Sequence, residues 1–146
     1  MGNLGQKGQA KLQYKIHWHV LLTHFPVSFF MLSSGFMVLH LYTGSDCYEL
    51  SAFLSLLAGA VILLPAAISG WVTWKGRYQG MRGKIFLYKI RTALGMIALS
   101  FALLFVRLVL HPQLHIVWMW IYPAGVFLLL TGAMVEGFYG GRLNHR

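Results

Sequence analysis

The stretch HWHVLLTHFPVSFFMLSSGFMVLHLY, from His17 to Tyr42, decides the fold of this 146-residue chain. It is long and apolar enough to cross a bilayer, because a helix needs about 20 mostly apolar residues to span the hydrocarbon core. It also contains four of the protein's seven histidines. His19 and His24 lie with His17 toward one end, and His40 lies near the other. A membrane span with imidazoles at both ends either marks two interfaces or places ligands at two depths.

Three further apolar stretches follow, and each has the length of a transmembrane helix. The expected helices cover about residues 19–42, 50–74, 86–110 and 115–139. Strand-like alternation is absent, and helices satisfy their own backbone hydrogen bonds in lipid. Because the connections are short, successive helices should be antiparallel neighbours. We predict an all-α membrane protein, with residues 1–146 forming a single domain that is an up-down-up-down bundle of four transmembrane helices.

The composition supports this class and excludes several others. The chain is 58% hydrophobic and 10% charged, whereas soluble domains are about 25% charged. The single cysteine, Cys47, excludes an internal disulfide, a Cys-rich zinc site, a four-Cys iron–sulfur cluster and a CxxCH haem attachment. Hydrolytic motifs and phosphate-binding glycine loops are also missing. The formal charge of +9 lies in short segments between apolar runs, which indicates membrane topology rather than nucleic-acid binding.

The basic residues also predict the orientation. All except Arg107 fall before the first expected helix, between the second and third, just inside the third, or after the fourth. By the positive-inside rule, both termini are cytoplasmic and the chain is a multi-pass protein of a bacterial inner membrane. Two aromatic rings should mark the interfaces. The inner ring comprises Trp18, Trp71, Trp74 and Tyr88, and the outer ring Tyr42, Tyr48, Trp118 and Tyr122.

Three histidines and one arginine are expected at the outer end of the bundle. His40 ends the first helix, His111 follows the third, His115 opens the fourth, and Arg107 is one turn before His111. Two imidazoles from different helices can hold the iron of a b-type haem, and an arginine suits its propionates. The haem hypothesis assigns His40 and His115 as axial ligands, with His111 as the substitute and Arg107 as the propionate partner.

The same residues have a simpler interpretation. Histidines are common at membrane interfaces, and a charge inside a membrane is usually paired. Arg107 could therefore extend outward to Asp46 or Glu49 without any cofactor. The sequence leaves both interpretations open.

At the inner end, a second group of residues could bind a quinone. His24, Lys89 and Arg91 offer hydrogen-bond donors, and Trp71 and Trp74 offer flat apolar walls at a similar depth. Histidine also suits the proton step of quinone chemistry, because its ordinary pKa lies near neutrality. A belt of basic residues that reach toward the lipid headgroups would have the same appearance.

Glu136 is the one acidic residue within an expected helix. It either relays protons or forms an ion pair with Lys89 or Arg91, and pairing is the more common role. A proton or metal-ion transporter using His24 and Glu136 is a further hypothesis. The second helix also has a stripe of small residues that allows helices to approach closely. This stripe comprises Ser51, Ser55, Gly59, Ala66 and Gly70.

Two short motifs resemble an uncharacterised family of small bacterial four-helix transmembrane domains. They are HFP in the first helix and a glycine–tryptophan end to the second, formed by His24, Phe25, Pro26, Gly70, Trp71 and Trp74. Members of that family sometimes accompany Rieske-type or other redox proteins, so the resemblance implies a role in electron transfer. The chain departs from the family where an acidic residue is replaced by Thr73 and a histidine by the Tyr88–Lys89 pair.

Together these patterns give two main functional hypotheses beside the transporter. The first is a small membrane subunit of a respiratory redox complex, which passes electrons between an outward-facing partner and the quinone pool through a b-type haem. The second is a cofactor-free structural subunit that anchors a larger complex in the membrane. In neither case is the chain expected to be catalytic alone.

Overall fold

The computed structural model describes residues 3–77, 79, 84–110 and 117–144, and the side chains of 22–76, 79, 87–109 and 119–139. The described residues form helices, with no strand among them. The α-helices are α1 (Asn3–Thr43), α2 (Asp46–Arg77), α3 (Lys84–Phe105) and α4 (Tyr122–Asn144). Two five-residue π-helical segments, η1 (Val106–Leu110) and η2 (Val117–Ile121), continue α3 and precede α4.

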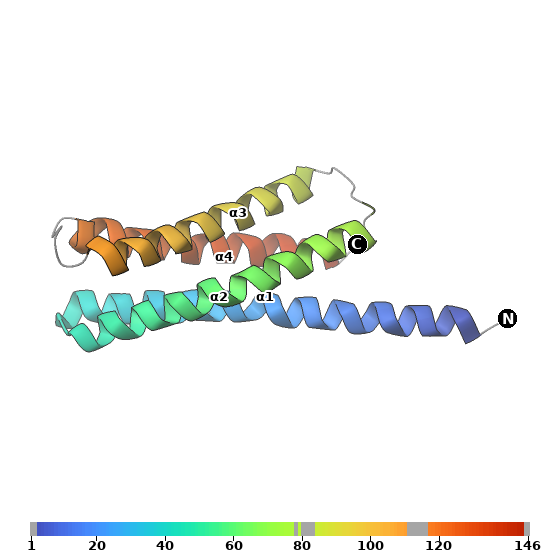
Figure 1. Ribbon diagram of the computed structural model, residues 1–146, viewed down its shortest axis with the longest axis horizontal. Helices are drawn as coiled ribbons and strands as arrows, with labels where there is room; N and C mark the ends of the chain where they lie inside the picture. The colour runs from blue at the N-terminus through green and yellow to red at the C-terminus, as the bar shows by residue number, and fades with distance from the viewer. Residues whose placement is uncertain (1–2, 78, 80–83, 111–116, 145–146) are drawn as a thin grey trace.

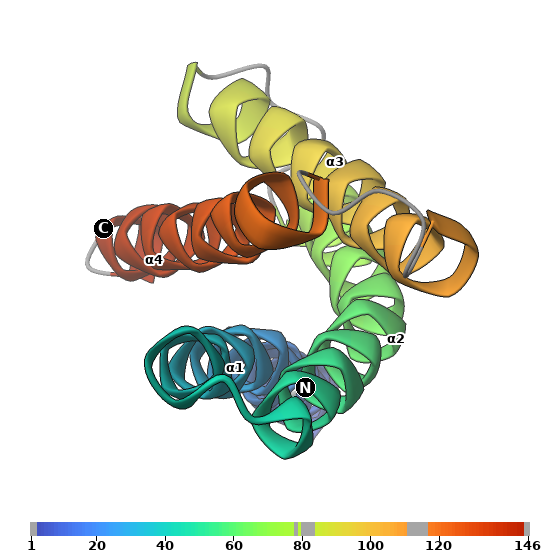
Figure 2. The same ribbon diagram turned by 90° about the vertical axis from the view of Figure 1, so that its left-hand side faces the viewer.

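The four long helices form a bundle in which each contacts two neighbours. α1 packs on α2 and α4, and α3 packs on the same two helices (Figure 2). Successive helices run in opposite directions, and both ends of the chain lie at the same end of the bundle (Figure 1). The described residues include four segments long and apolar enough to cross a membrane, of which the third continues from α3 into η1 and the fourth begins in η2. These segments are Leu22–Thr43, Asp46–Gly76, Leu87–Val109 and Met119–Tyr139. The all-α, four-helix prediction is therefore confirmed.

Two helix boundaries differ from the expected ones. α1 begins at Asn3 rather than near residue 19, and its first part continues past the ends of the other helices (Figure 1). We call Asn3–Trp18, the part of α1 that precedes the expected span, the N-terminal arm; at 1.5 Å per residue it is about 24 Å long. α2 begins at Asp46 rather than near residue 50, which places Asp46 and Glu49 in its first turn. Acidic residues there are favoured by the partial positive charge at a helix N-terminus.

The core joins all four helices around large side chains. Its most completely buried members include Phe30, Met37, Leu56, Leu129 and Tyr122. Tyr122 was expected in the outer aromatic ring, but only 1% of it is exposed. Many large apolar side chains are exposed on the surface of the bundle, as expected for a surface in contact with lipid. Leu108, Ile68 and Leu94 are among the most exposed.

Gly59 marks a close approach of α2 to α1. A Cβ added there would lie 2.8 Å from Cε1 of Phe30 and 3.2 Å from Cβ of Phe29. Phe30 is only 1% exposed and has little room to move. The predicted use of the small-residue stripe for close packing is thus confirmed at this position.

Gly59→Ala should lower the free energy of unfolding by about 1 kcal/mol or more, because overpacking forces a shift in the Phe30 ring. Gly95→Ala is the matched control, since a Cβ at Gly95 meets nothing within 4 Å. It should be neutral or slightly stabilising, because alanine is the better helix former. Unfolding of both variants by SDS titration in mixed micelles checks the difference. Equal effects would contradict the close contact.

Candidate functional site

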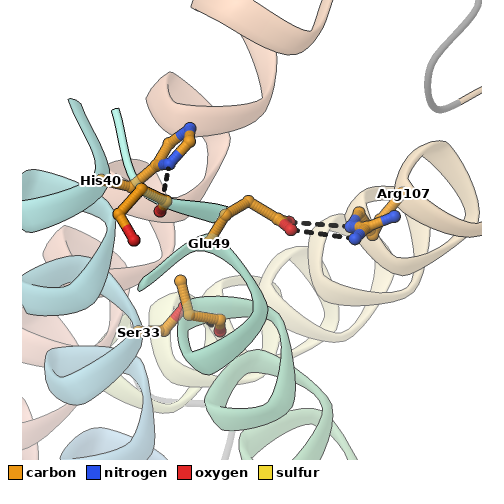
Figure 3. Close-up of polar contacts among 6 residues, drawn as sticks. Ser33, His40, Glu49 and Arg107 are labelled. Atoms are coloured by element: carbon orange, nitrogen blue, oxygen red, sulfur yellow. Dashed lines mark hydrogen bonds and ion pairs between the residues drawn. The ribbon is translucent and has the colours of Figure 1, made fainter. Parts of the chain in front are cut away.

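We call the end of the bundle away from the chain termini the outer end, and the opposite one the inner end, after the predicted orientation. The outer end contains a two-point ion pair between α2 and η1. Nε of Arg107 donates to Oε1 of Glu49 at 2.7 Å, and Nη2 donates to Oε2 at 2.9 Å (Figure 3). The Glu49 side chain is 7% exposed and the Arg107 side chain 21%. The guanidinium also lies 5.4 Å from the centroid of the Phe53 ring. Such parallel, charge-assisted bonds are among the strongest hydrogen bonds in proteins.

This ion pair bears on the two interpretations of Arg107. The sequence left open a haem propionate or one of the two outer acidic residues as its partner. In the structure the partner is Glu49, so a residue of the chain itself neutralises the charge of Arg107. The sequence placed Glu49 in a loop, whereas the earlier start of α2 turns its carboxylate into the bundle toward η1.

His40 is held beside this pair by the turn between α1 and α2. Its Nδ1 lies 3.0 Å from the backbone oxygen of Ser45 (Figure 3). Because a carbonyl oxygen can only accept, Nδ1 carries the proton in this bond, and in the neutral ring Nε2 keeps a lone pair. The turn is closed by Gly44, which has a φ of 68° and donates its N–H to the His40 oxygen at 2.7 Å. A left-handed glycine in this place is a common helix ending.

A cavity of about 200 Å³ lies next to His40. We call it the outer cavity. Its walls come from α1, α2, η2 and α4, and include Met37, His40, Glu49, Met119, Tyr122 and Pro123. Pockets for drug-sized ligands measure about 300–1,000 Å³, so a porphyrin does not fit this cavity as it stands. The other two proposed haem ligands, His111 and His115, lie outside the described residues.

The two methionines of the outer cavity were not among the site residues predicted from the sequence. Met37 precedes His40 by three residues, which places both on one side of α1. That spacing is the only local signal for the site. Met119 comes from η2, far away in sequence, and meets them only through the packing of the bundle. A search of the described residues for three or more His, Cys, Asp or Glu side chains that could hold a metal found none.

The inner end has a second ion pair, between α3 and α4. Nζ of Lys89 lies 3.8 Å from Oε2 of Glu136, which confirms pairing as a role of Glu136. Of the residues predicted to bind a quinone, Lys89 forms this ion pair. His24 and Arg91 are exposed in the bundle.

The two inner tryptophans lie together on α2. Their ring centroids are 5.2 Å apart in an edge-to-face arrangement, and Nζ of Lys75 lies 5.3 Å from the centroid of Trp71. Trp74 therefore packs beside Trp71, as its position three residues later in a helix allows. An aromatic and basic cluster of this kind suits the level of the lipid headgroups.

Comparison of the chain with protein families, with characterised proteins and with solved structures found no match in any of the three. The class of protein is therefore defined by its own features. It is a helical bundle with four segments able to span a membrane, an ion pair at each end and a small cavity at the outer one.

Proposed function

We propose that the chain is a small integral-membrane subunit that anchors a larger protein complex in a bacterial inner membrane, with both termini in the cytoplasm. The observation that carries this proposal is the N-terminal arm, because the N-terminal end of α1 continues past the ends of the other helices (Figure 1). A helix of this length gains most of its stability from packing against another surface. The arm therefore offers a binding site for a partner subunit on the cytoplasmic side.

The sequence of the arm indicates what kind of partner it binds. Lys7, Lys11 and Lys15 recur every four residues, so a helix places them along one side. The arm contains no acidic residue. A partner with an acidic surface would complement this row of charges.

The ion pairs inside the bundle also suit an anchoring role. Glu49 pairs with Arg107 at one end, and Glu136 pairs with Lys89 at the other. Each pair links two helices and neutralises charges that would be costly in lipid. Both pairs balance these charges without any ligand.

Replacing Lys7, Lys11 and Lys15 by glutamine tests the anchoring proposal. In mild detergent, the wild-type chain should co-purify in fixed proportion with larger proteins and migrate with them on a native gel. The triple variant should lose these proteins, because the charge complementarity that holds them is removed. Replacing Arg142 and Arg146 by glutamine is the control and should leave the complex intact. A wild-type chain that migrates alone would contradict the proposal.

Electron transfer is the second candidate, and the observation that favours it is the His40 ring. With Nδ1 bonded to the Ser45 oxygen, Nε2 is the nitrogen that a haem iron would use. In this proposal, His40 and His115 (or His111) hold a b-type haem with Arg107 beside it, and electrons pass between an outward-facing partner and the quinone pool. A haem at this end requires a wider cavity and a rearranged Glu49–Arg107 pair.

An optical spectrum separates the two candidates. Protein purified from haem-replete cells should show a reduced-minus-oxidised Soret difference if it carries a b-type haem, and a flat difference spectrum excludes that role. The quinone site proposed around His24, Trp74, Lys89 and Arg91 is tested separately, by measuring quinone in an organic extract of the same preparation.

A further inference from the structure

The outer cavity brings together one imidazole and two thioethers. His40 and Met37 come from α1, and Met119 comes from η2. A cavity of about 200 Å³ can contain one metal ion with its ligand atoms, although it is too small for a porphyrin. We propose that the outer cavity binds a single soft, monovalent metal ion, Cu(I), through Nε2 of His40 and the sulfur atoms of Met37 and Met119. This inference goes beyond anchoring and does not depend on it.

The ligand types select the ion. Thioether sulfur is a soft ligand that favours Cu(I), whereas Mg²⁺, Ca²⁺ and Mn²⁺ prefer carboxylate and carbonyl oxygens. The one carboxylate in the cavity wall, that of Glu49, is bound at both oxygens by Arg107. It therefore brings little net negative charge to the site. A divalent ion would add two uncompensated charges in a region of low dielectric constant, and a monovalent ion adds one.

The orientation of His40 supports a ligand role. Metal-binding histidines usually donate their other ring N–H to a carboxylate, a backbone oxygen or water, which fixes the ring and its tautomer. The Nδ1 to Ser45 oxygen bond of 3.0 Å is of this kind (Figure 3). It leaves Nε2 as the nitrogen available for an ion.

The backbone around the cavity is also unusual. Met119 lies in the π-helical segment η2, and Arg107 lies in the π-helical segment η1. Short π-helical turns within helices are often found at functional sites. Here η2 carries Met119, which lines the outer cavity, and η1 carries Arg107, which binds Glu49.

The two methionines of the site differ in exposure. Met37 is 1% exposed and forms the floor, whereas Met119 is 43% exposed and lies at the rim. The exposed side chain of Met119 therefore makes one side of the cavity accessible from the surface of the bundle. A buried methionine on its own is ordinary core packing, so the experiment must separate ligation from packing.

The experiment titrates Cu(I) into the purified full-length chain without oxygen, in competition with a coloured Cu(I) chelator. We expect one Cu(I) per chain, and we expect Met119→Leu to weaken binding by at least about 10-fold, as losses at metal sites do. Met119 is partly exposed, so this variant should fold normally. Met37→Leu and His40→Gln should also weaken binding, and X-ray absorption of the Cu(I) protein should show both sulfur and nitrogen ligands.

The controls are methionines on the outward surface of the same bundle. Met31 on α1 is 55% exposed and Met134 on α4 is 60% exposed. Met31→Leu and Met134→Leu should bind Cu(I) like the wild type. The proposal is overturned by substoichiometric binding, by equal losses in site and control variants, or by a haem bound at His40. If the wild-type chain migrates without partner proteins on a native gel but binds Cu(I), the result contradicts the anchoring proposal and leaves the Cu(I) proposal standing.

Discussion

Glu49→Gln is expected to lower the free energy of unfolding by about 3 kcal/mol, because it leaves the Arg107 charge half-buried without its counterion. The cost is high because the pair lies within a segment able to span a membrane, where a lone charge is poorly solvated. Steric trapping or SDS titration in bicelles measures this free energy. Asp46→Asn is the matched control, since Asp46 lies in the same first turn of α2 but is exposed. It should lower the free energy of unfolding by no more than about 1 kcal/mol, the usual contribution of an acidic residue at a helix N-terminus.

The double variant Glu49→Met/Arg107→Met extends this test. Replacing both members of a buried pair by apolar residues of similar volume is often neutral or stabilising. We therefore expect the double variant to recover most of the stability that Glu49→Gln loses. A double variant less stable than the single one would show that Arg107 or Glu49 has another essential contact.

Leu129→Ala is expected to lower the free energy of unfolding by about 2 kcal/mol. Leu129 is 0% exposed at the centre of the bundle, so truncation leaves a cavity that its neighbours fill only in part. The neighbouring Leu128→Ala is the control, because Leu128 is 60% exposed and loses few protein contacts. Since lipid tails are as apolar as leucine, its truncation has little cost in a membrane.

The comparison between Leu128 and Leu129 also tests how the bundle is solvated. In bicelles the two variants should differ strongly. If truncation of Leu128 is as costly as truncation of Leu129, the surface of α4 around Leu128 is covered by protein, either a partner or a second copy of the chain. The same two measurements thus separate a lipid-facing helix surface from a hidden interface.

The helices were predictable from sequence because hydrophobic length alone identifies a membrane span. The N-terminal arm was not, because its polar residues show no apolar stretch for such a criterion to find. Its glutamine, lysine, leucine and alanine residues are good helix formers, and this local preference was the available signal. The start of α2 was missed for a related reason, since Asp46 and Glu49 resemble a polar loop until their position at a helix N-terminus is recognised.

The site was only partly predictable. Arg107 was identified by its position against the charge bias, and its acidic partner was narrowed to Asp46 or Glu49. The choice between them depends on where α2 begins and on its rotation, which a single sequence does not fix. The contact of Met37 with the same cavity as Met119 depends on how α1 meets α4, and long-range packing of this kind leaves no local pattern.

The turn between α1 and α2 has a consequence for recognition from the outer side. Only Gly44 and Ser45 separate the two helices, so no loop projects beyond the helix ends at this corner of the molecule. A protein that binds at this corner would contact Tyr42, which is 87% exposed, and the exposed side chain of Asp46. Such a protein would need a projecting loop of its own to make deep contacts at this corner.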